Sequence, residues 1–161
     1  MRFQDDILPR LGPWIRPFLK RYWLVSRGMT LGVRGAVFDG DGRVFLIRHT
    51  YVPGWHLPGG GVDLGETVRQ ALDKELREEG NIRLLGEPQL FAVYHNVRIY
   101  RRDHVVLFVA RQWEQPEAPV PNAEIAEHGW FQLDALPAET SPATRRRLDE
   151  IAGDQPPAAV W

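Results

Sequence analysis

The segment from Leu57 to Ile82 constrains the fold most, because a glycine-rich turn runs there directly into an acidic helix. Pro58 is followed by three consecutive glycines, which predicts a turn whose backbone a ligand can approach closely. Thr67 is a suitable helix cap, so the pattern predicts a helix from Thr67 to Glu79. Its apolar stripe consists of Val68, Ala71, Leu72 and Leu76.

Three carboxylates fall on one face of this predicted helix, because Glu75, Glu78 and Glu79 stand at positions i, i+3 and i+4. Like charges so placed repel each other by about 0.2–0.5 kcal/mol per pair in water. A divalent cation would turn this repulsion into binding, and a glycine carbonyl from the preceding turn would complete the ligand shell. The chain has no cysteine, and oxygen ligands favour Mg²⁺ or Mn²⁺ over zinc. The alternative is a solvated helix face that is merely rich in glutamate.

Alternating apolar and polar residues predict strands on both sides of this unit. The two strands before it are joined by Asp39-Gly-Asp-Gly42, a sequence typical of a β-hairpin turn. The order of strands, helix, strands and helix predicts an α+β or mixed α/β fold, with the helices covering the sheet. The predicted strands are 31–38, 43–48, 90–97, 104–113 and 129–132, the second helix is 144–152, and the loops are 50–65 and 114–123.

The length of 161 residues suits one domain, which we place at residues 30–152. Residues 1–29 are an N-terminal extension, in which residues 13–23 carry the apolar face of a short amphipathic helix. We expect this helix to pack on the domain, and a membrane-surface or dimer-forming helix is the alternative. Residues 153–161 are expected to be a frayed C-terminal tail.

Composition and charge exclude several classes of protein. The net charge of −1 gives no overall basic surface, so we expect no stable complex with nucleic acid. The absence of cysteine excludes disulfide scaffolds, iron–sulfur ligation and thiol catalysis. No apolar run reaches the roughly 18 residues of a membrane-spanning helix, and the N-terminus lacks a signal-peptide pattern, so we expect a cytoplasmic protein.

The spacing of these residues resembles the Nudix box, Gly-x5-Glu-x7-Arg-Glu-U-x-Glu-Glu-x-Gly-U, in which U is a bulky aliphatic residue. Residues 60–82 follow this pattern with two departures. Lys74 stands where the family has arginine, which keeps the charge but loses the bidentate fork. Asn81 stands where the family has glycine, and asparagine is the next-best residue for a left-handed helix end.

The resemblance implies a Nudix hydrolase with an α/β/α sandwich around a mixed sheet and a loop–helix–loop box. Such enzymes use Mg²⁺ or Mn²⁺ to hydrolyse the pyrophosphate bond of a nucleoside diphosphate linked to another moiety. The catalytic base is either a box glutamate or a residue on a later loop, where we prefer Glu124 to Glu127. The residues that the resemblance implies are the metal ligands Glu75, Glu78, Glu79 and the Gly59 carbonyl, and the structural or outer-shell residues Gly60, Glu66 and Lys74.

The substrate pocket is less well defined by the sequence. Arg98 is a candidate for a phosphate contact, and Trp55 and Tyr94 are candidates for stacking on a base. The alternatives are a solvated turn for the arginine and core packing for the aromatic residues. We expect a nucleotide-type small molecule as substrate, and the choice between nucleoside triphosphates and nucleotide sugars or ADP-ribose stays open, as does a homodimer.

A nucleotide-binding or regulatory module with the same fold and no turnover is the alternative function. Such a module would be expected to carry a broken set of acidic residues. All four box glutamates are present here, at positions 66, 75, 78 and 79, which favours an enzyme.

Overall fold

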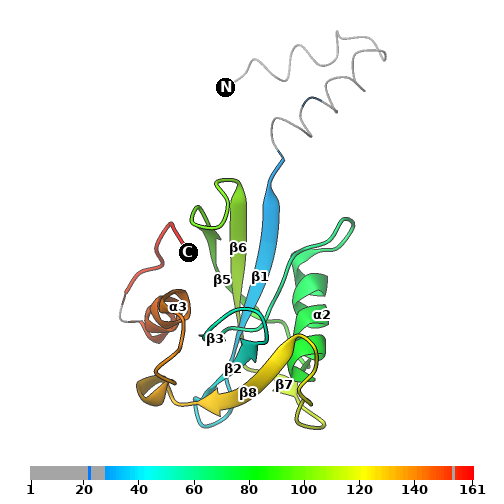
Figure 1. Cartoon of the computed structure of the whole chain (residues 1–161), viewed down its shortest axis with the longest axis vertical. Helices are drawn as coiled ribbons and strands as arrows, with labels where there is room; N and C mark the ends of the chain where they lie inside the picture. The colour runs from blue at the N-terminus through cyan, green and yellow to red at the C-terminus, as the bar shows by residue number, and fades with distance from the viewer. Residues whose placement is uncertain (1–21, 23–27, 154) are drawn as a thin grey trace.

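The computed structural model describes residues 22, 28–153 and 155–161, and Figure 1 shows the arrangement of its elements. The helix predicted at residues 13–23, and with it most of the extension 1–29, lies outside the described residues except for Tyr22 and residues 28–29. The elements in chain order are β1 Thr30–Val37, β2 Val44–His49, β3 Trp55–His56, α2 Val68–Gly80, β4 Arg83–Leu84, β5 Gln89–His95, β6 Asp103–Ala110, β7 Trp113–Glu114, β8 Ile125–Phe131, a 3₁₀ turn Leu133–Ala135 and α3 Pro142–Ala152.

The strands form two three-stranded sheets and one short two-stranded sheet. The first has the order β1-β6-β5, with β1 parallel and β5 antiparallel to β6. The second has the order β3-β2-β8 and is antiparallel, and β4 pairs with β7 in the third. Helices α2 and α3 lie on opposite sides of the strands (Figure 1). The predicted mixed α+β architecture is therefore confirmed.

Each helix covers its own hydrophobic core. Leu72 and Leu76 of α2 pack with Val33 and Val106, whereas Leu148 of α3 belongs to a second cluster on the other side of β1 and β6. Alternate residues of a strand face opposite sides of a sheet, so β1 and β6 contribute to both cores. Within the described part of the chain, neither helix is long and apolar enough to cross a membrane.

The predicted hairpin between the first two strands forms only at its tip. The turn closes through the Asp39 N–H, which donates to the Arg43 carbonyl at 3.0 Å, and Phe38 bridges Val44. Beyond that point β1 pairs with β6 and β2 pairs with β8. The predicted hairpin turn is therefore present, but the two strands do not pair along their length, because turn chemistry specifies the reversal of the chain and not the partner of each strand.

Helix α2 begins and ends within one residue of the predicted bounds. The Gln70 N–H donates to the Thr67 side chain at 3.2 Å, and the Gln70 side chain accepts from the Thr67 N–H at 2.9 Å, which together form a capping box. Asn81 ends the helix in the left-handed conformation, with φ of 49°. The replacement of the box glycine by asparagine is thus accommodated at this helix end.

The C-terminal residues are docked on the sheet, so the expectation of a frayed tail was wrong. The His95 N–H of β5 donates to the Ala159 carbonyl at 2.9 Å, and the Trp161 N–H donates to the His95 carbonyl at 3.1 Å. The Trp161 ring lies edge-on to Tyr94, with ring centroids 5.4 Å apart. The tail therefore pairs with the end of β5 at His95, on the edge that β6 leaves open.

Candidate active site

Strand β1 holds the glycine-rich loop in place. The Val33 N–H donates to the Gly60 carbonyl at 2.8 Å, and the Gly35 N–H donates to the Pro58 carbonyl at 2.9 Å. Gly59 has φ of 139°, and a Cβ there would lie 2.2 Å from the Val33 carbonyl oxygen. Only glycine fits this position, since any side chain would push the loop away from β1.

Glu79 is the most buried carboxylate of the box, with 6% of its surface exposed. Its Oε2 accepts a hydrogen bond from the Gly59 N–H at 2.6 Å. Burial raises the pKa of Glu79 to about 8, while the bond from Gly59 and the charge of Arg34 act in the opposite direction. A cation bound beside such a buried carboxylate would stabilise its ionised form.

Glu75 lies against the same loop, directly over Gly60. A Cβ at Gly60 would come within 2.5 Å of Glu75 Oε1, so the glycine makes room for the carboxylate. Burial raises the pKa of Glu75, and the negative charges of Glu78 and Glu124 raise it further. Glu78 itself is exposed.

The two glutamates near the start of β8 lie in different surroundings. Glu124 directly precedes the strand, and Glu127 lies on it. The charge of Glu124 raises the pKa of both Glu75 and Glu79, so Glu124 acts electrostatically on the box carboxylates. Glu127 instead forms an ion pair with Arg48 on the neighbouring strand β2, directly opposite in register. Of the two candidate bases, only Glu124 is electrostatically coupled to the box.

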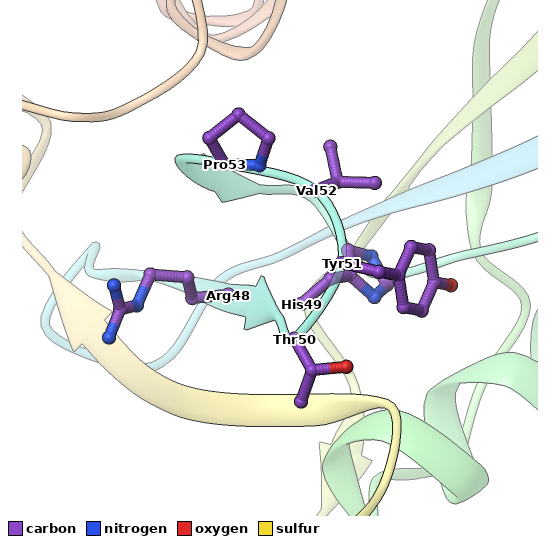
Figure 2. A pocket seen from close by; sticks show the side chains of 6 residues that line it. All are labelled: Arg48, His49, Thr50, Tyr51, Val52 and Pro53. Carbon is purple, nitrogen blue, oxygen red and sulfur yellow. The ribbon is translucent and has the colours of Figure 1, made fainter.

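His49 and Tyr51 border this cluster, and their rings lie side by side in Figure 2 with centroids 5.2 Å apart. His49 Nε2 is 3.9 Å from Glu79 Oε1, and its Nδ1 is buried, with the ring beside the backbone of Glu124. Burial lowers the pKa of His49, and the charge of Arg34 lowers it further. Tyr51 is 65% exposed. Both residues line a shallow pocket formed by residues 48–53.

Arg34 of β1 reaches the loop from the side of the sheet. Its Nη1 donates to the carbonyls of Leu57, at 3.2 Å, and Gly59. Burial lowers the pKa of Arg34, whereas the charges of Glu79 and Glu75 raise it. The Gly59 carbonyl, which the sequence assigns to the metal, thus accepts from a guanidinium in this structure.

Lys74 ties the loop to the helix. Its Nζ donates to Asp63 at 2.9 Å and lies 3.1 Å from Glu66 Oε1, but it is 3.9 Å from Glu75 Oε1. The hydrogen bond to Asp63, followed by that to Glu66, raises the pKa of Lys74. Its principal partners are therefore two loop carboxylates, and it anchors the loop through both Asp63 and Glu66.

The three predicted substrate contacts lie in different surroundings. Tyr94 is fully buried, donates to Glu150 at 2.8 Å and lies under the Arg147 guanidinium, so its predicted stacking role does not fit the structure. Trp55 is 9% exposed and packs edge-on against Phe131 at 4.9 Å, which leaves little of its ring for a base. Arg98 lies exposed in the turn between β5 and β6, and its phosphate contact stays a prediction.

Three functional candidates were missed by the sequence interpretation, namely Arg34, His49 and Tyr51. Each is a single residue in or next to a strand, where no spacing pattern distinguishes it from an ordinary strand residue. Only their approach to Gly59, Glu79 and each other identifies them. A signal was present in the run Arg48-His49-Thr50-Tyr51, since charged and aromatic residues there directly precede the glycine-rich loop.

The oxygen atoms at this site suit a hard divalent cation, although the side chains that carry them do not converge on one point. Among the described residues, no three His, Asp or Glu side chains converge closely enough to hold a metal ion as they stand. Glu75 and Glu79 are nevertheless carboxylates whose pKa values burial raises, beside a loop with a backbone carbonyl. Carboxylate and carbonyl oxygens are the ligands that Mg²⁺ and Mn²⁺ prefer.

Comparison with known proteins places this site in a family. The family model described as NUDIX domain matches residues 28–151. The chain is 30% identical over 136 residues to the RNA pyrophosphohydrolase of Halorhodospira halophila, covering 79% of this chain and 62% of that protein. It is 44% identical over 57 residues to the RNA pyrophosphohydrolase of Gluconobacter oxydans, covering 32% and 34%. The chain thus spans less than two thirds of the length of these curated relatives.

A solved structure shares both the fold and part of the sequence. The MutT NUDIX hydrolase from Burkholderia pseudomallei superposes with a TM-score of 0.65 at 30% identity, covering 76% of this chain and 97% of that one. A UDP-X diphosphatase has a TM-score of 0.64 at 20% identity and covers 94% of this chain and 78% of its own, a likeness that bears on the fold alone. With a matching family model over most of its length, the chain belongs to the NUDIX domain family.

Proposed function

We propose that this chain is a pyrophosphohydrolase that uses Mg²⁺ or Mn²⁺ to cleave a nucleoside diphosphate linked to another moiety. The observation that carries the proposal is the position of Glu79. This carboxylate is buried against the Gly59 N–H, and burial raises its pKa to about 8. Burial of a carboxylate costs free energy that a helix without a bound ligand does not recover, whereas a cation beside the carboxylate would offset that cost.

The residues proposed to hold the cation are Glu75, Glu78, Glu79 and the Gly59 carbonyl. When bound, such a cation neutralises charge on phosphate oxygens and lowers the pKa of an attacking water. The chain itself supplies the base, for which Glu124 is the favoured residue because its charge acts on both Glu75 and Glu79. Gly60 leaves Glu75 the space to face the loop, and Lys74 keeps that loop attached to α2.

The substrate side of the proposal rests on the pocket of residues 48–53 (Figure 2). The Tyr51 ring is exposed beside the carboxylates, which suits stacking on a nucleobase. Tyr51 therefore replaces Tyr94 as the proposed stacking residue.

The binding-module alternative lacks a specific observation in its favour, since all four box glutamates remain. The test is a screen of the purified protein with Mg²⁺ or Mn²⁺ against nucleoside triphosphates, dinucleoside polyphosphates, nucleotide sugars, ADP-ribose and NADH. RNA with a 5′-triphosphate belongs in the screen because two relatives are named RNA pyrophosphohydrolases.

The screen reads released phosphate, pyrophosphate and nucleoside monophosphate, with chelator and Glu79→Gln as controls. We expect turnover of at least one substrate that chelator abolishes and Glu79→Gln reduces about a hundredfold or more. Binding of nucleotides without any turnover would overturn the proposal in favour of the binding module.

A further inference from the structure

Arg34 is a cation inside the acidic site that no feature of the box requires. Its side chain is half-buried, and both of its hydrogen bonds, to the Leu57 and Gly59 carbonyls, come from Nη1. Its Nε and Nη2 make no hydrogen bond within the described residues, and they are not among the polar atoms sealed from solvent. A guanidinium carries five N–H donors, so most of them are available to a ligand.

The charge of Arg34 is balanced only at a distance. Among the described residues, no carboxylate oxygen lies within 4.0 Å of its guanidinium, although Glu79 and Glu75 act on it electrostatically. A divalent cation bound by those same carboxylates would cancel their charge. Arg34 would then be left half-buried without a counter-charge, a state that costs free energy unless an anion approaches.

Loop support alone does not account for an arginine at this position. A carbonyl oxygen is satisfied by any neutral donor, and burying a permanent charge to reach two carbonyls is an expensive way to do so. The guanidinium fork matches the geometry of phosphate oxygens, which it binds with two parallel hydrogen bonds. The open N–H groups of Arg34 thus fit a phosphate better than they fit any group of the protein around them.

We propose that Arg34 is a substrate-binding residue that holds a phosphate of the diphosphate group through the N–H groups that Leu57 and Gly59 leave free. The proposal rests on the function proposed above and adds a second, protein-borne positive charge to the phosphate site. It also predicts opposite effects of Arg34 on the two ligands. Arg34 should attract the anionic diphosphate, and it should repel the divalent cation with which it competes for the Gly59 carbonyl.

The test measures the two affinities separately by calorimetry or thermal shift. The first ligand is Mg²⁺ alone, and the second is methylenediphosphonate in saturating Mg²⁺, a diphosphate analogue whose P–C–P bond resists hydrolysis. The variants are Arg34→Gln, which keeps a donor for the carbonyls but loses the charge, and Arg34→Lys, which keeps the charge. Arg43→Met is the control, because Arg43 pairs with Asp39 and Asp41 in the distant β1–β2 turn.

We expect Arg34→Gln to weaken diphosphonate binding by roughly 10- to 100-fold and to leave Mg²⁺ binding equal or tighter. Arg34→Lys should recover a large part of the lost affinity, and Arg43→Met should change neither. An unchanged diphosphonate affinity in Arg34→Gln would overturn the proposal while leaving the proposed function intact. Equal weakening of both ligands would also overturn it, since that is the signature of a damaged loop. If the parent binds no diphosphonate in Mg²⁺, this proposal fails, and the turnover screen still decides the proposed function.

A second measurement uses the unmodified protein, so it does not depend on the folding of any variant. Phenylglyoxal modifies accessible arginines, and mass spectrometry reports the rate at each one. Methylenediphosphonate with Mg²⁺ should slow modification of Arg34 several-fold and leave Arg43 unaffected. Equal rates at Arg34 with and without the ligand would contradict the proposal.

Discussion

The Glu79 carboxylate accepts a 2.6 Å hydrogen bond from the Gly59 N–H, and this contact joins the last turn of α2 to the glycine-rich loop. It spans 20 residues of sequence and is buried. Because the loop is also bonded to β1, helix, loop and sheet are fixed relative to one another at the point where the carboxylates gather. A change at Glu79 therefore affects the stability, the metal affinity and the chemistry of the site in separable ways.

The stability of the metal-free protein should depend on the ionisation of Glu79. Its pKa is raised from about 4.5 to about 8 on folding, so the folded state binds more protons than the unfolded state between these values. The stabilisation is complete below about pH 4.5 and is lost as the pH rises towards 8. Glu79→Gln removes this dependence and can still accept from the Gly59 N–H.

We therefore expect the free energy of unfolding of Glu79→Gln to rise relative to the parent between pH 5 and pH 8 in chelator, by on the order of 3 kcal/mol. Thermal denaturation of both proteins across that pH range measures the difference. In the same variant the thermal shift on adding Mg²⁺ should shrink, because that shift follows the dissociation constant. A constant difference in melting temperature at every pH would contradict the raised pKa.

Gly60 and its neighbour Gly61 offer a matched pair of substitutions. A Cβ at Gly60 would displace the Glu75 carboxylate, whereas a Cβ at Gly61 would meet nothing within 4 Å. Since a flexible carboxylate can move aside, Gly60→Ala should leave the melting temperature nearly unchanged and reduce turnover by about a hundredfold. Gly61→Ala should have little effect on either quantity. Similar rates for the two variants would show that the place of Glu75 is unimportant.

The two glutamates near β8 should differ in their effect on the rate. Glu124→Gln removes the group coupled to Glu75 and Glu79, so we expect turnover to fall by about 10²- to 10⁴-fold. Glu127→Gln breaks only an exposed ion pair with Arg48, which contributes about 1 kcal/mol or less to stability. Steady-state rates on a substrate from the screen decide the matter, and a larger loss in Glu127→Gln would reverse the assignment.

Lys74 should act through the loop that it anchors. Lys74→Arg keeps the charge and gains a fork, so activity should be kept or modestly raised. Lys74→Ala releases Asp63 and Glu66 and should lower kcat about two- to tenfold, with a weaker response to Mg²⁺. If the alanine variant matches the parent in both rate and metal affinity, the position has no orienting role.

The box unit could be predicted from sequence because its signals are local. Helical periodicity, the Thr67 cap and the offsets of the glutamates all lie within one stretch of chain, and α2 begins and ends accordingly. Long-range pairing is different, since nothing in the turn after β1 specifies that this strand pairs with β6. For the same reason no sequence signal marked Arg34, because its importance comes from the loop whose carbonyls it contacts.

The aromatic residues also show that long-range packing could not be predicted from the sequence. Tyr94 and Tyr51 are indistinguishable as tyrosines in or near strands, yet one is fully buried and the other is 65% exposed. The difference arises from helix α3 and the C-terminal tail together, because Arg147 of α3 and Trp161 of the tail cover the Tyr94 ring. A short segment rich in proline and alanine carries no periodic signal that would predict such docking.

The docked tail leads to a prediction about stability that is independent of the active site. Arg147 is fully buried, donates to Glu150 at 2.7 Å and donates to the Val160 carbonyl at 3.0 Å. The Trp161 ring lies 5.5 Å from the Arg147 guanidinium and covers this buried pair from outside. Removal of the ring is expected to admit water to this buried charge pair and so to weaken it.

Trp161→Ala should therefore lower the free energy of unfolding by about 2–3 kcal/mol, from lost apolar burial and the lost cation–π contact. Val160→Ala is the control, since that side chain is 41% exposed and the backbone bond to Arg147 is kept.

Turnover well below the melting temperature should be unchanged in both variants, because the tail and α2 lie on opposite sides of the strands (Figure 1). Denaturant unfolding with parallel rate measurements tests both statements. An unchanged unfolding midpoint in Trp161→Ala would mean that the tail does not stabilise the domain, and a loss of rate without a loss of stability would mean that the tail acts on the site.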